Sequence, residues 1–172
     1  MRRFHSRAAE WDYERSNIIL TLDYLPTPET RRLAERLLAA HPSRRGTTSQ
    51  ELLDRMSREL KVPPVTVHFR DQPQKHRRRN GRLTYKEYAH YSPDGSITIY
   101  NKTAVREQYL APKAYLDTLV HEFLHHLDYE LLKLQHTFHT KGFYSRLGDL
   151  LAKLQGRRGP QLDLFGRPAS PN

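Results

Sequence analysis

Apolar residues recur at helical spacing in the first third of the chain. Thr27 followed by Pro28 is typical of a helix start, because threonine caps free N–H groups and proline fits the first turn. A second start at Thr48 precedes an apolar run that Pro63 ends. The pattern predicts two amphipathic helices, the first over residues 28–40, with these apolar positions: Leu33, Leu37, Leu38, Leu52, Leu53, Met56 and Leu60.

The middle of the chain alternates apolar and polar residues, as expected for strands with one buried face. The predicted strands cover residues 65–69, 83–91 and 96–100, and a basic loop covers residues 75–82. Before the last strand, Pro93 and Gly95 form a turn sequence, since proline fixes φ and glycine allows a positive φ. The last two strands are therefore predicted to pair as a hairpin, and residues 96–100 to form an edge strand that an extended peptide could join.

The longest helical pattern begins at Pro112 and extends to about residue 135, with one broad apolar stripe. A short turn at residues 136–140 precedes a last helix that ends near residue 154. Helices, then a small sheet, then helices predict an α+β domain over residues 28–154. Residues 1–27 form an N-terminal arm of uncertain structure, and the Gly- and Pro-rich residues 155–172 are predicted to be a flexible tail.

Composition and net charge limit the kinds of site and partner that the chain can have. The chain has no cysteine, which excludes disulfides, Cys-ligated zinc and a thiol nucleophile. A formal net charge of +10 favours a polyanionic partner, most plausibly nucleic acid. The alternative is that the basic run only solubilises a loop. The densest basic cluster, which we expect to contact nucleic acid, contains Lys75, Arg77, Arg78, Arg79 and Arg82.

The sequence gives no sign of a membrane segment. No stretch approaches the roughly 20 apolar residues that a membrane span needs. Residues 1–16 are charged throughout and lack the apolar core of a signal peptide. We therefore expect a cytoplasmic protein with no membrane partner, associated with the nucleoid if the source is bacterial.

Residues 121–125 read His-Glu-Phe-Leu-His in the middle of the longest predicted helix. His121 and His125, at positions i and i+4, share one helix face, so both imidazoles can reach one ion. Glu122 lies about 100° around the helix, which suits a general base and not a ligand. The bland alternative is a pair of solvated or packing histidines, but both lie beside the apolar stripe and not within it. The pattern therefore predicts a metal-dependent hydrolytic site.

A catalytic zinc usually has three protein ligands and one open position, so a third ligand must come from elsewhere. Asp128 shares the ligand face but lies roughly 10 Å along the helix from His121, so we expect it to bond to an imidazole N–H instead. His139, at the start of the last helix, is the predicted third ligand, with His136 as the alternative. His126 points off the face and is expected to be structural or exposed.

At these residues the sequence resembles the SprT-like zinc metallopeptidases and related minimal zincins. The resemblance is carried by residues 121–125 and by His139 with Gly142, Phe143 and Tyr144, and it covers residues 65–154. It implies a zincin-like fold in which helices pack on a small antiparallel sheet. It also implies one Zn²⁺ held by His121, His125 and His139, with Glu122 as the catalytic carboxylate.

Two features depart from the family pattern. Thr140 stands where SprT proteins often have glycine after the third histidine, and the absence of cysteine excludes their usual zinc ribbon. Tyr144 and His126 are both candidates to stabilise the oxyanion, and the sequence does not choose between them.

The tail contains an apolar motif in polar surroundings. Residues 161–165 resemble the short Q-L-x-L-F peptides by which bacterial proteins bind the DNA sliding clamp. In such peptides Leu and Phe anchor in an apolar groove and Gln makes a polar contact. The alternative is that these side chains fold back on the protein's own surface. The predicted clamp-binding residues are Gln161, Leu162, Asp163, Leu164 and Phe165.

Together these features predict a zinc metallopeptidase that cleaves DNA-associated protein substrates and is recruited by a sliding clamp. SprT-like relatives include proteases that remove proteins crosslinked to DNA, so a similar repair role is what the resemblance implies. Two alternatives remain. One is a peptidase that cleaves a specific regulator such as a repressor, and the other is a non-catalytic DNA- and clamp-binding adaptor with a structural zinc.

Overall fold

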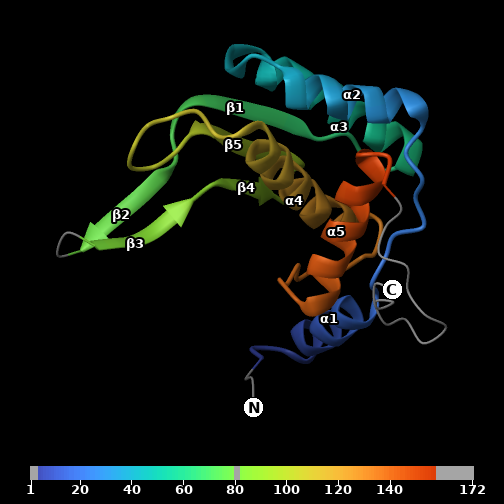
Figure 1. Ribbon diagram of the computed structural model, residues 1–172. Coiled ribbons are helices and arrows are strands. Elements are labelled where there is room, and N and C mark those ends of the chain that lie inside the picture. Colours follow the sequence, from blue (N-terminus) through green and yellow to red (C-terminus); the bar gives the residue numbers. More distant parts are fainter. Residues whose placement is uncertain (1–3, 80–81, 158–172) are drawn as a thin grey trace, which may run out of the picture.

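The computed structural model describes residues 4–79 and 82–157 (Figure 1). Over these residues the chain forms an α+β fold, as predicted. The helices are α1 (Arg7–Ile18), α2 (Pro28–Ala39), α3 (Arg45–Leu60), α4 (Pro112–Glu130) and α5 (Lys141–Leu154), with a 3₁₀ turn η1 (Pro42–Arg44). The strands are β1 (Thr66–Pro73), β2 (Lys75–Arg79), β3 (Arg82–Glu87), β4 (Ala89–Ser92) and β5 (Ser96–Lys102). No helix in this part of the chain is long and apolar enough to cross a membrane.

The main sheet is mixed, so the predicted antiparallel sheet is wrong in one pairing. Its order is β1-β5-β4, with β5 parallel to β1 and antiparallel to β4. The β4–β5 hairpin is confirmed, and its turn contains Gly95 at φ +83°, a conformation that glycine adopts without strain. The prediction that residues 96–100 form an edge strand is also wrong. β5 lies between β1 and β4 and is therefore the central strand of the main sheet. Within this sheet, β4 and β1 are the edges.

The prediction of a basic loop over residues 75–82 is also wrong, because most of these residues belong to strands β2 and β3. β2 and β3 pair antiparallel as a separate two-stranded sheet, which projects from the body of the molecule (Figure 1). The predicted strand over residues 83–91 is divided at Tyr88 into β3 and β4. Consecutive Lys and Arg residues carry no apolar alternation, so the sequence shows no strand signal there.

The helices follow their local signals, with shifted ends. α2 begins as predicted, and the Thr27 hydroxyl accepts a hydrogen bond from the Thr30 N–H. α3 begins at Arg45, earlier than Thr48, because buried Arg45 donates to Asn101 and to the Leu110 carbonyl. α4 ends at Glu130 and not near residue 135. α1 lies in the arm of uncertain structure and buries little apolar surface, so it gave no periodic signal.

The core places α4 at the centre of the molecule. Its apolar stripe, including Leu119 and Phe123, is fully buried in the core that also contains Ile97 and Ile99 of β5, and α4 packs against α2, α5, β4 and β5. The face of α4 that carries His121 and His125 therefore lies at the edge of the core. α5 passes beside α4 (Figure 1). The site geometry follows from this packing.

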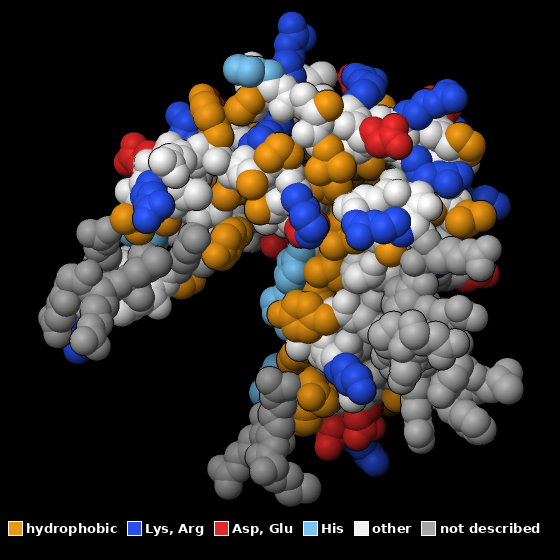
Figure 2. All heavy atoms as spheres, viewed as in Figure 1, with side chains coloured by type: hydrophobic (Ala, Val, Ile, Leu, Met, Phe, Trp, Pro, Cys, Tyr) orange, Lys and Arg blue, Asp and Glu red, His pale blue; other side chains and the backbone are white. Residues whose placement is uncertain are grey.

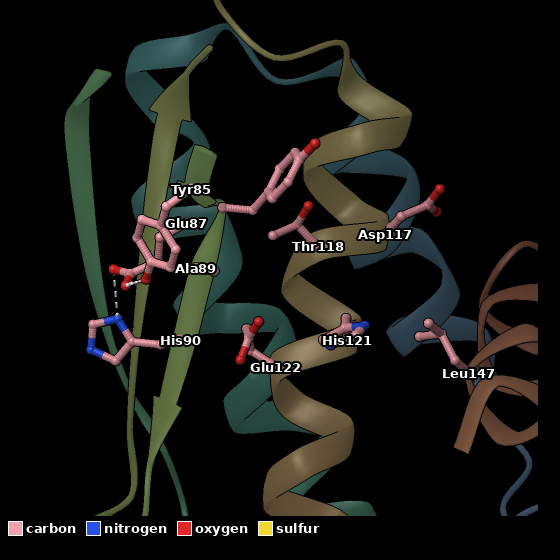
Figure 3. Close-up of a pocket in the computed structure, with 10 residues that line it drawn as sticks. Tyr85, Glu87, Ala89, His90, Asp117, Thr118, His121, Glu122 and Leu147 are labelled. Carbon is pink, nitrogen blue, oxygen red and sulfur yellow. Dashed lines mark hydrogen bonds and ion pairs between the residues drawn. The ribbon is translucent and has the colours of Figure 1, made fainter. Parts of the chain in front are cut away.

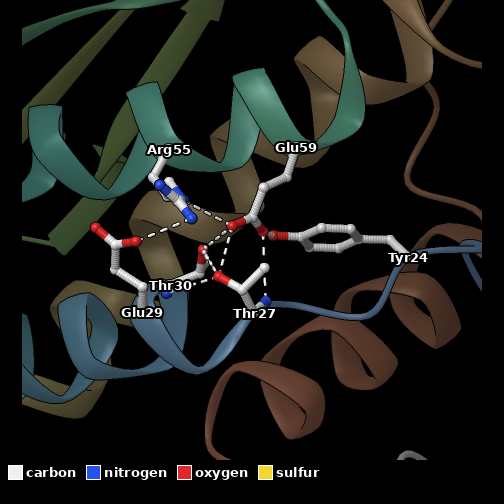
Figure 4. Close-up of polar contacts among 6 residues, drawn as sticks. All are labelled: Tyr24, Thr27, Glu29, Thr30, Arg55 and Glu59. Carbon is white, nitrogen blue, oxygen red and sulfur yellow. Dashed lines mark hydrogen bonds and ion pairs between the residues drawn. The ribbon is translucent and has the colours of Figure 1, made fainter.

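A partly buried carboxylate, that of Glu59, ties the chain before α2 to α3 (Figure 4). Glu59 accepts hydrogen bonds from Tyr24 Oη at 2.7 Å, Thr27 Oγ1 at 2.7 Å, Thr30 Oγ1 at 2.6 Å and Arg55 Nε at 2.8 Å. Burial alone would raise the pKa of Glu59, but these donors together lower it to about 2. The network fixes the segment that leads from α1 into α2.

Candidate metal centre

Three imidazoles converge beside the core, two from α4 and one from the segment before α5. His139 Nε2 lies 2.8 Å from His121 Nε2 and 3.1 Å from His125 Nε2. Their ligand atoms all lie within 4.8 Å of one another, which is close enough to hold a metal ion. Figure 2 shows histidine side chains along the wall of a hollow between the β2–β3 side of the molecule and the α5 side.

Hydrogen bonds alone do not account for this arrangement. An imidazole nitrogen offers either one N–H or one lone pair in the ring plane, so His139 Nε2 cannot bond to both neighbours at once. Ligand nitrogens at 2.0–2.1 Å from a tetrahedral zinc lie about 3.3 Å apart, near the separations seen here. All-imidazole sites suit zinc among several transition metals. The three residues therefore fit a single bound ion.

Phe143 packs against all three imidazoles from one side. Its ring centroid lies 5.0 Å from that of His121, 4.7 Å from that of His125 and 5.1 Å from that of His139, and the side chain is fully buried. The Tyr144 ring stacks with His139 at a centroid distance of 5.9 Å and is 55% exposed, so it is open to solvent. These neighbours hold the rings and leave the outer side accessible.

Burial keeps the imidazoles in the form that binds metal. It lowers the pKa of His121 to about 4 and that of His125 to about 3, and it also lowers the pKa of His139. His121 and His125 are therefore neutral well below pH 6.5, the pKa of a free imidazole, and the pKa of His139 is shifted in the same direction. Since only the neutral ring binds, we expect metal affinity to persist below the pH at which free imidazoles become protonated and to fall as pH drops towards 4, where His121 titrates.

Competition with a fluorescent chelator across this pH range measures that dependence, after correction for the chelator's own protonation. An affinity that declined steeply from pH 7 downward would contradict it, because the histidines would then titrate like free imidazoles.

Asp128 does not contact an imidazole, so its predicted role is wrong. Its carboxylate accepts hydrogen bonds from Arg146 Nε at 3.2 Å and Nη2 at 2.7 Å, and both side chains are 0% exposed. His125 Nδ1 is buried and has no hydrogen-bond partner among the described residues. A guanidinium on α5 offers a full charge and two donors, which a buried carboxylate pairs with more strongly than with a neutral N–H.

The structure places His136 and His126 outside the metal centre. His136 Nδ1 lies 2.9 Å from Asp12 Oδ2 on α1. His126 is buried, with Nε2 at 2.8 Å from the Pro63 carbonyl and Nδ1 at 3.3 Å from the Tyr91 hydroxyl. Of the two candidates for a third ligand, the geometry brings His139 to the pair on α4. Of the two candidates to stabilise the oxyanion, Tyr144 is beside the imidazoles and His126 is not.

Glu122 extends from α4 towards β4, next to His121 (Figure 3). The side chain lies at a cavity of about 530 Å³ between these elements and α5 and is 8% exposed. Burial raises its pKa to about 7, against a smaller opposing effect of a backbone hydrogen bond from Tyr91. A carboxylate that titrates near neutrality can both accept and return a proton. The cavity is lined by Tyr85, Glu87, Tyr88, Ala89, His90, Asp117, Thr118, His121, Glu122 and Leu147.

The basic hairpin borders this cavity. Lys75 and Arg77 line a second hollow of about 810 Å³, and Tyr85 and Glu87 line both. Arg79 is exposed on the same hairpin. The side chains of Arg78 and Arg82, and the tail motif of residues 161–165, lie outside what the structure describes. Lys75 and Arg77 therefore lie in a hollow that shares lining residues with the pocket that contains Glu122.

Comparisons with protein-family models, with curated proteins and with solved structures find no match to this chain. An assignment of activity therefore depends on the side chains that the fold brings together. These are three convergent imidazoles, a buried carboxylate beside them, and a pocket between β4 and α4 that a basic hairpin borders.

Proposed function

We propose that this protein is a zinc-dependent peptidase of the SprT-like, minimal-zincin kind that cleaves DNA-associated proteins. The observation that carries the proposal is the convergence of His121, His125 and His139 beside the buried carboxylate of Glu122. A structural zinc site is closed by four protein ligands, whereas a catalytic site keeps one position open. The described residues supply three ligands next to an accessible pocket, which favours catalysis over a purely structural metal.

Each part of the site has a role in peptide hydrolysis. Zinc, when bound, supplies Lewis-acid chemistry that makes water acidic near neutral pH and polarises a carbonyl. Glu122 accepts the proton of the attacking water and passes it to the leaving amine. The Tyr144 phenol, stacked on His139, donates a hydrogen bond to the developing oxyanion.

The edge strand β4 gives the substrate a place to bind. Ala89 and His90 of β4 line the same pocket as Glu122, and β4 pairs with β5 on one side only within the main sheet. An extended peptide added to that edge forms main-chain hydrogen bonds and passes Glu122. This mode accepts many sequences, which suits a protease that acts on varied proteins.

The association with DNA is supported by charge placement. The net charge is +10, and Lys75 and Arg77 line a hollow that shares the lining residues Tyr85 and Glu87 with the Glu122 pocket. DNA held along the hairpin brings a protein bound to it within reach of the site. Recruitment by a sliding clamp through residues 161–165 is part of the proposal, supported by the sequence motif alone.

We expect removal of hairpin charge to weaken DNA binding in a salt-dependent way. In the double variant Arg77→Ser/Arg79→Ser, the slope of log K against log salt should decrease in magnitude by about 1.4–1.8, since each lost phosphate contact contributes about 0.7–0.9. Fluorescence anisotropy of labelled DNA at several salt concentrations measures the slope. DNA should also stimulate cleavage of a DNA-bound protein by the wild type.

The matched control is Arg32→Ser/Arg58→Ser, which removes two exposed arginines on α2 and α3. Its slope should equal that of the wild type. Equal slopes for both double variants would reject the hairpin as the DNA contact. Cleavage that was independent of DNA and insensitive to salt would favour a regulator substrate over DNA-associated proteins in general.

A further inference from the structure

The third ligand lies on a segment that has no helix or strand of its own. Residues 132–140, between α4 and α5, are irregular, yet His139 Nε2 must stay within a few tenths of an ångström of a ligand position to bind metal. His121 and His125 need no such support, because one rigid helix sets their spacing. Other contacts must therefore fix His139.

α1 holds this segment on the N-terminal side of His139. Asp12 Oδ2 accepts a hydrogen bond from the His136 backbone N–H at 2.9 Å and lies 2.9 Å from His136 Nδ1. Asp12 is almost fully buried, so one carboxylate oxygen fixes both the backbone and the side chain of His136. The constraint lies close to His139 along the chain.

α1 also holds the residue that follows His139. Ser16 Oγ and Thr140 Oγ1 are 2.9 Å apart, and Thr140 caps α5 by accepting from the Phe143 N–H at 3.0 Å. The chain passes closely here, since a Cβ added at Gly142 would lie 2.0 Å from the Ser16 carbonyl oxygen. The direct neighbour of His139 is thus fixed against the last turn of α1 (Figure 1).

Arg146 joins α1 to both helices of the metal centre. It donates to the Ser16 carbonyl at 2.8 Å, to Ser16 Oγ at 3.0 Å and to the Ile19 carbonyl, while it pairs with Asp128 of α4. One buried side chain on α5 therefore connects the end of α1 to the helix that carries His121 and His125. A shift of α1 would be transmitted to the ligand segment through these bonds.

The face that α1 buries is mainly polar. Its buried residues are Ala9, Asp12 and Ser16, whereas Trp11 and Ile18 are exposed. A helix that served only to extend the core would bury its large apolar side chains. We propose that α1 is a positioning element for the third ligand, in which Asp12 and Ser16 fix His139 and so couple the docking of α1 to metal binding.

This inference rests on the proposed metal site and adds a regulatory consequence. Because coupling between two binding events is reciprocal, metal binding must strengthen the docking of α1 by the factor by which docking strengthens metal binding. Any event that displaces α1 would then weaken metal binding and lower the rate of hydrolysis at limiting zinc.

The test is zinc affinity of the full-length protein, measured by chelator competition. Asp12→Ala and Ser16→Ala should each weaken zinc binding about tenfold, the lower end of the range for residues that orient metal ligands. Glu14→Ala, an exposed position on the same helix, is the control and should bind as the wild type does. Hydrogen exchange gives the reciprocal readout, in which zinc should slow amide exchange over residues 7–18 by about tenfold.

A second background separates positioning from general destabilisation. In His139→Ala, Asp12→Ala should cause no further loss of zinc affinity, because the residue through which it acts is gone. The proposal is overturned if Asp12→Ala and Ser16→Ala bind zinc like the wild type, or if the loss persists undiminished in His139→Ala. Absence of zinc binding by the wild type would instead overturn the proposed function, and this inference with it.

Discussion

Glu122→Gln should retain zinc and lose peptide cleavage by about 10³-fold, within the range for a general acid–base residue. The amide has nearly the size of the carboxylate, so the buried position stays filled and the three imidazoles keep their places. It cannot accept a proton, and the carboxyl that it replaces has a pKa raised by burial to about 7. Zinc content by mass spectrometry and initial rates on a DNA-bound protein substrate measure the two properties.

Asp117→Asn is the matched control, because Asp117 lies on the same helix and lines the same pocket. It should keep both zinc and most of the activity, since its carboxylate pairs with Lys113 and takes no part in proton transfer. Full cleavage by Glu122→Gln would reject the catalytic account and favour an adaptor with a structural metal.

Arg146→Ala should lower the free energy of unfolding by about 3–5 kcal/mol, the cost of leaving one member of a buried ion pair alone. Arg146 and Asp128 are both 0% exposed, and Arg146 also satisfies the Ser16 and Ile19 carbonyls at the end of α1. Urea unfolding of the metal-free protein measures this stability term apart from zinc binding.

The exposed pair Lys113–Asp117 provides the comparison. Lys113→Ala should change the unfolding free energy by less than about 1 kcal/mol, because water already solvates that pair. Similar small effects for both variants would mean that Asp128 is not a buried charge dependent on Arg146.

Local signals predicted the parts of the site that depend on a few neighbouring residues. The spacing of His121 and His125 fixes their common face once the helix forms, and the turn before β5 follows from Pro93 and Gly95. The start of α2 is equally local, because Thr27 caps residues next to it. These predictions needed no knowledge of the rest of the chain.

Long-range pairings could not be predicted in the same way. The parallel pairing of β1 with β5 depends on the path of the intervening chain. The pairs Arg146–Asp128 and His136–Asp12 join charged or polar residues, which are usually exposed to solvent, so nothing in the sequence indicates that they are in contact. α1 shows no apolar stripe, because what it buries is a carboxylate and a hydroxyl. The buried charged groups, Asp12, Asp128 and Arg146, are therefore the part of the structure that the sequence did not predict. The same groups hold the segment that carries His139 in place.

The central claim is a single metal ion bound by His121, His125 and His139. Native mass spectrometry of the full chain at a fixed, saturating excess of zinc, followed by buffer exchange, tests it directly. The account predicts one zinc per wild-type chain, one in His136→Ala and none retained in His139→Ala. Retention by His139→Ala with loss from His136→Ala, or a wild type that binds no zinc, would contradict it.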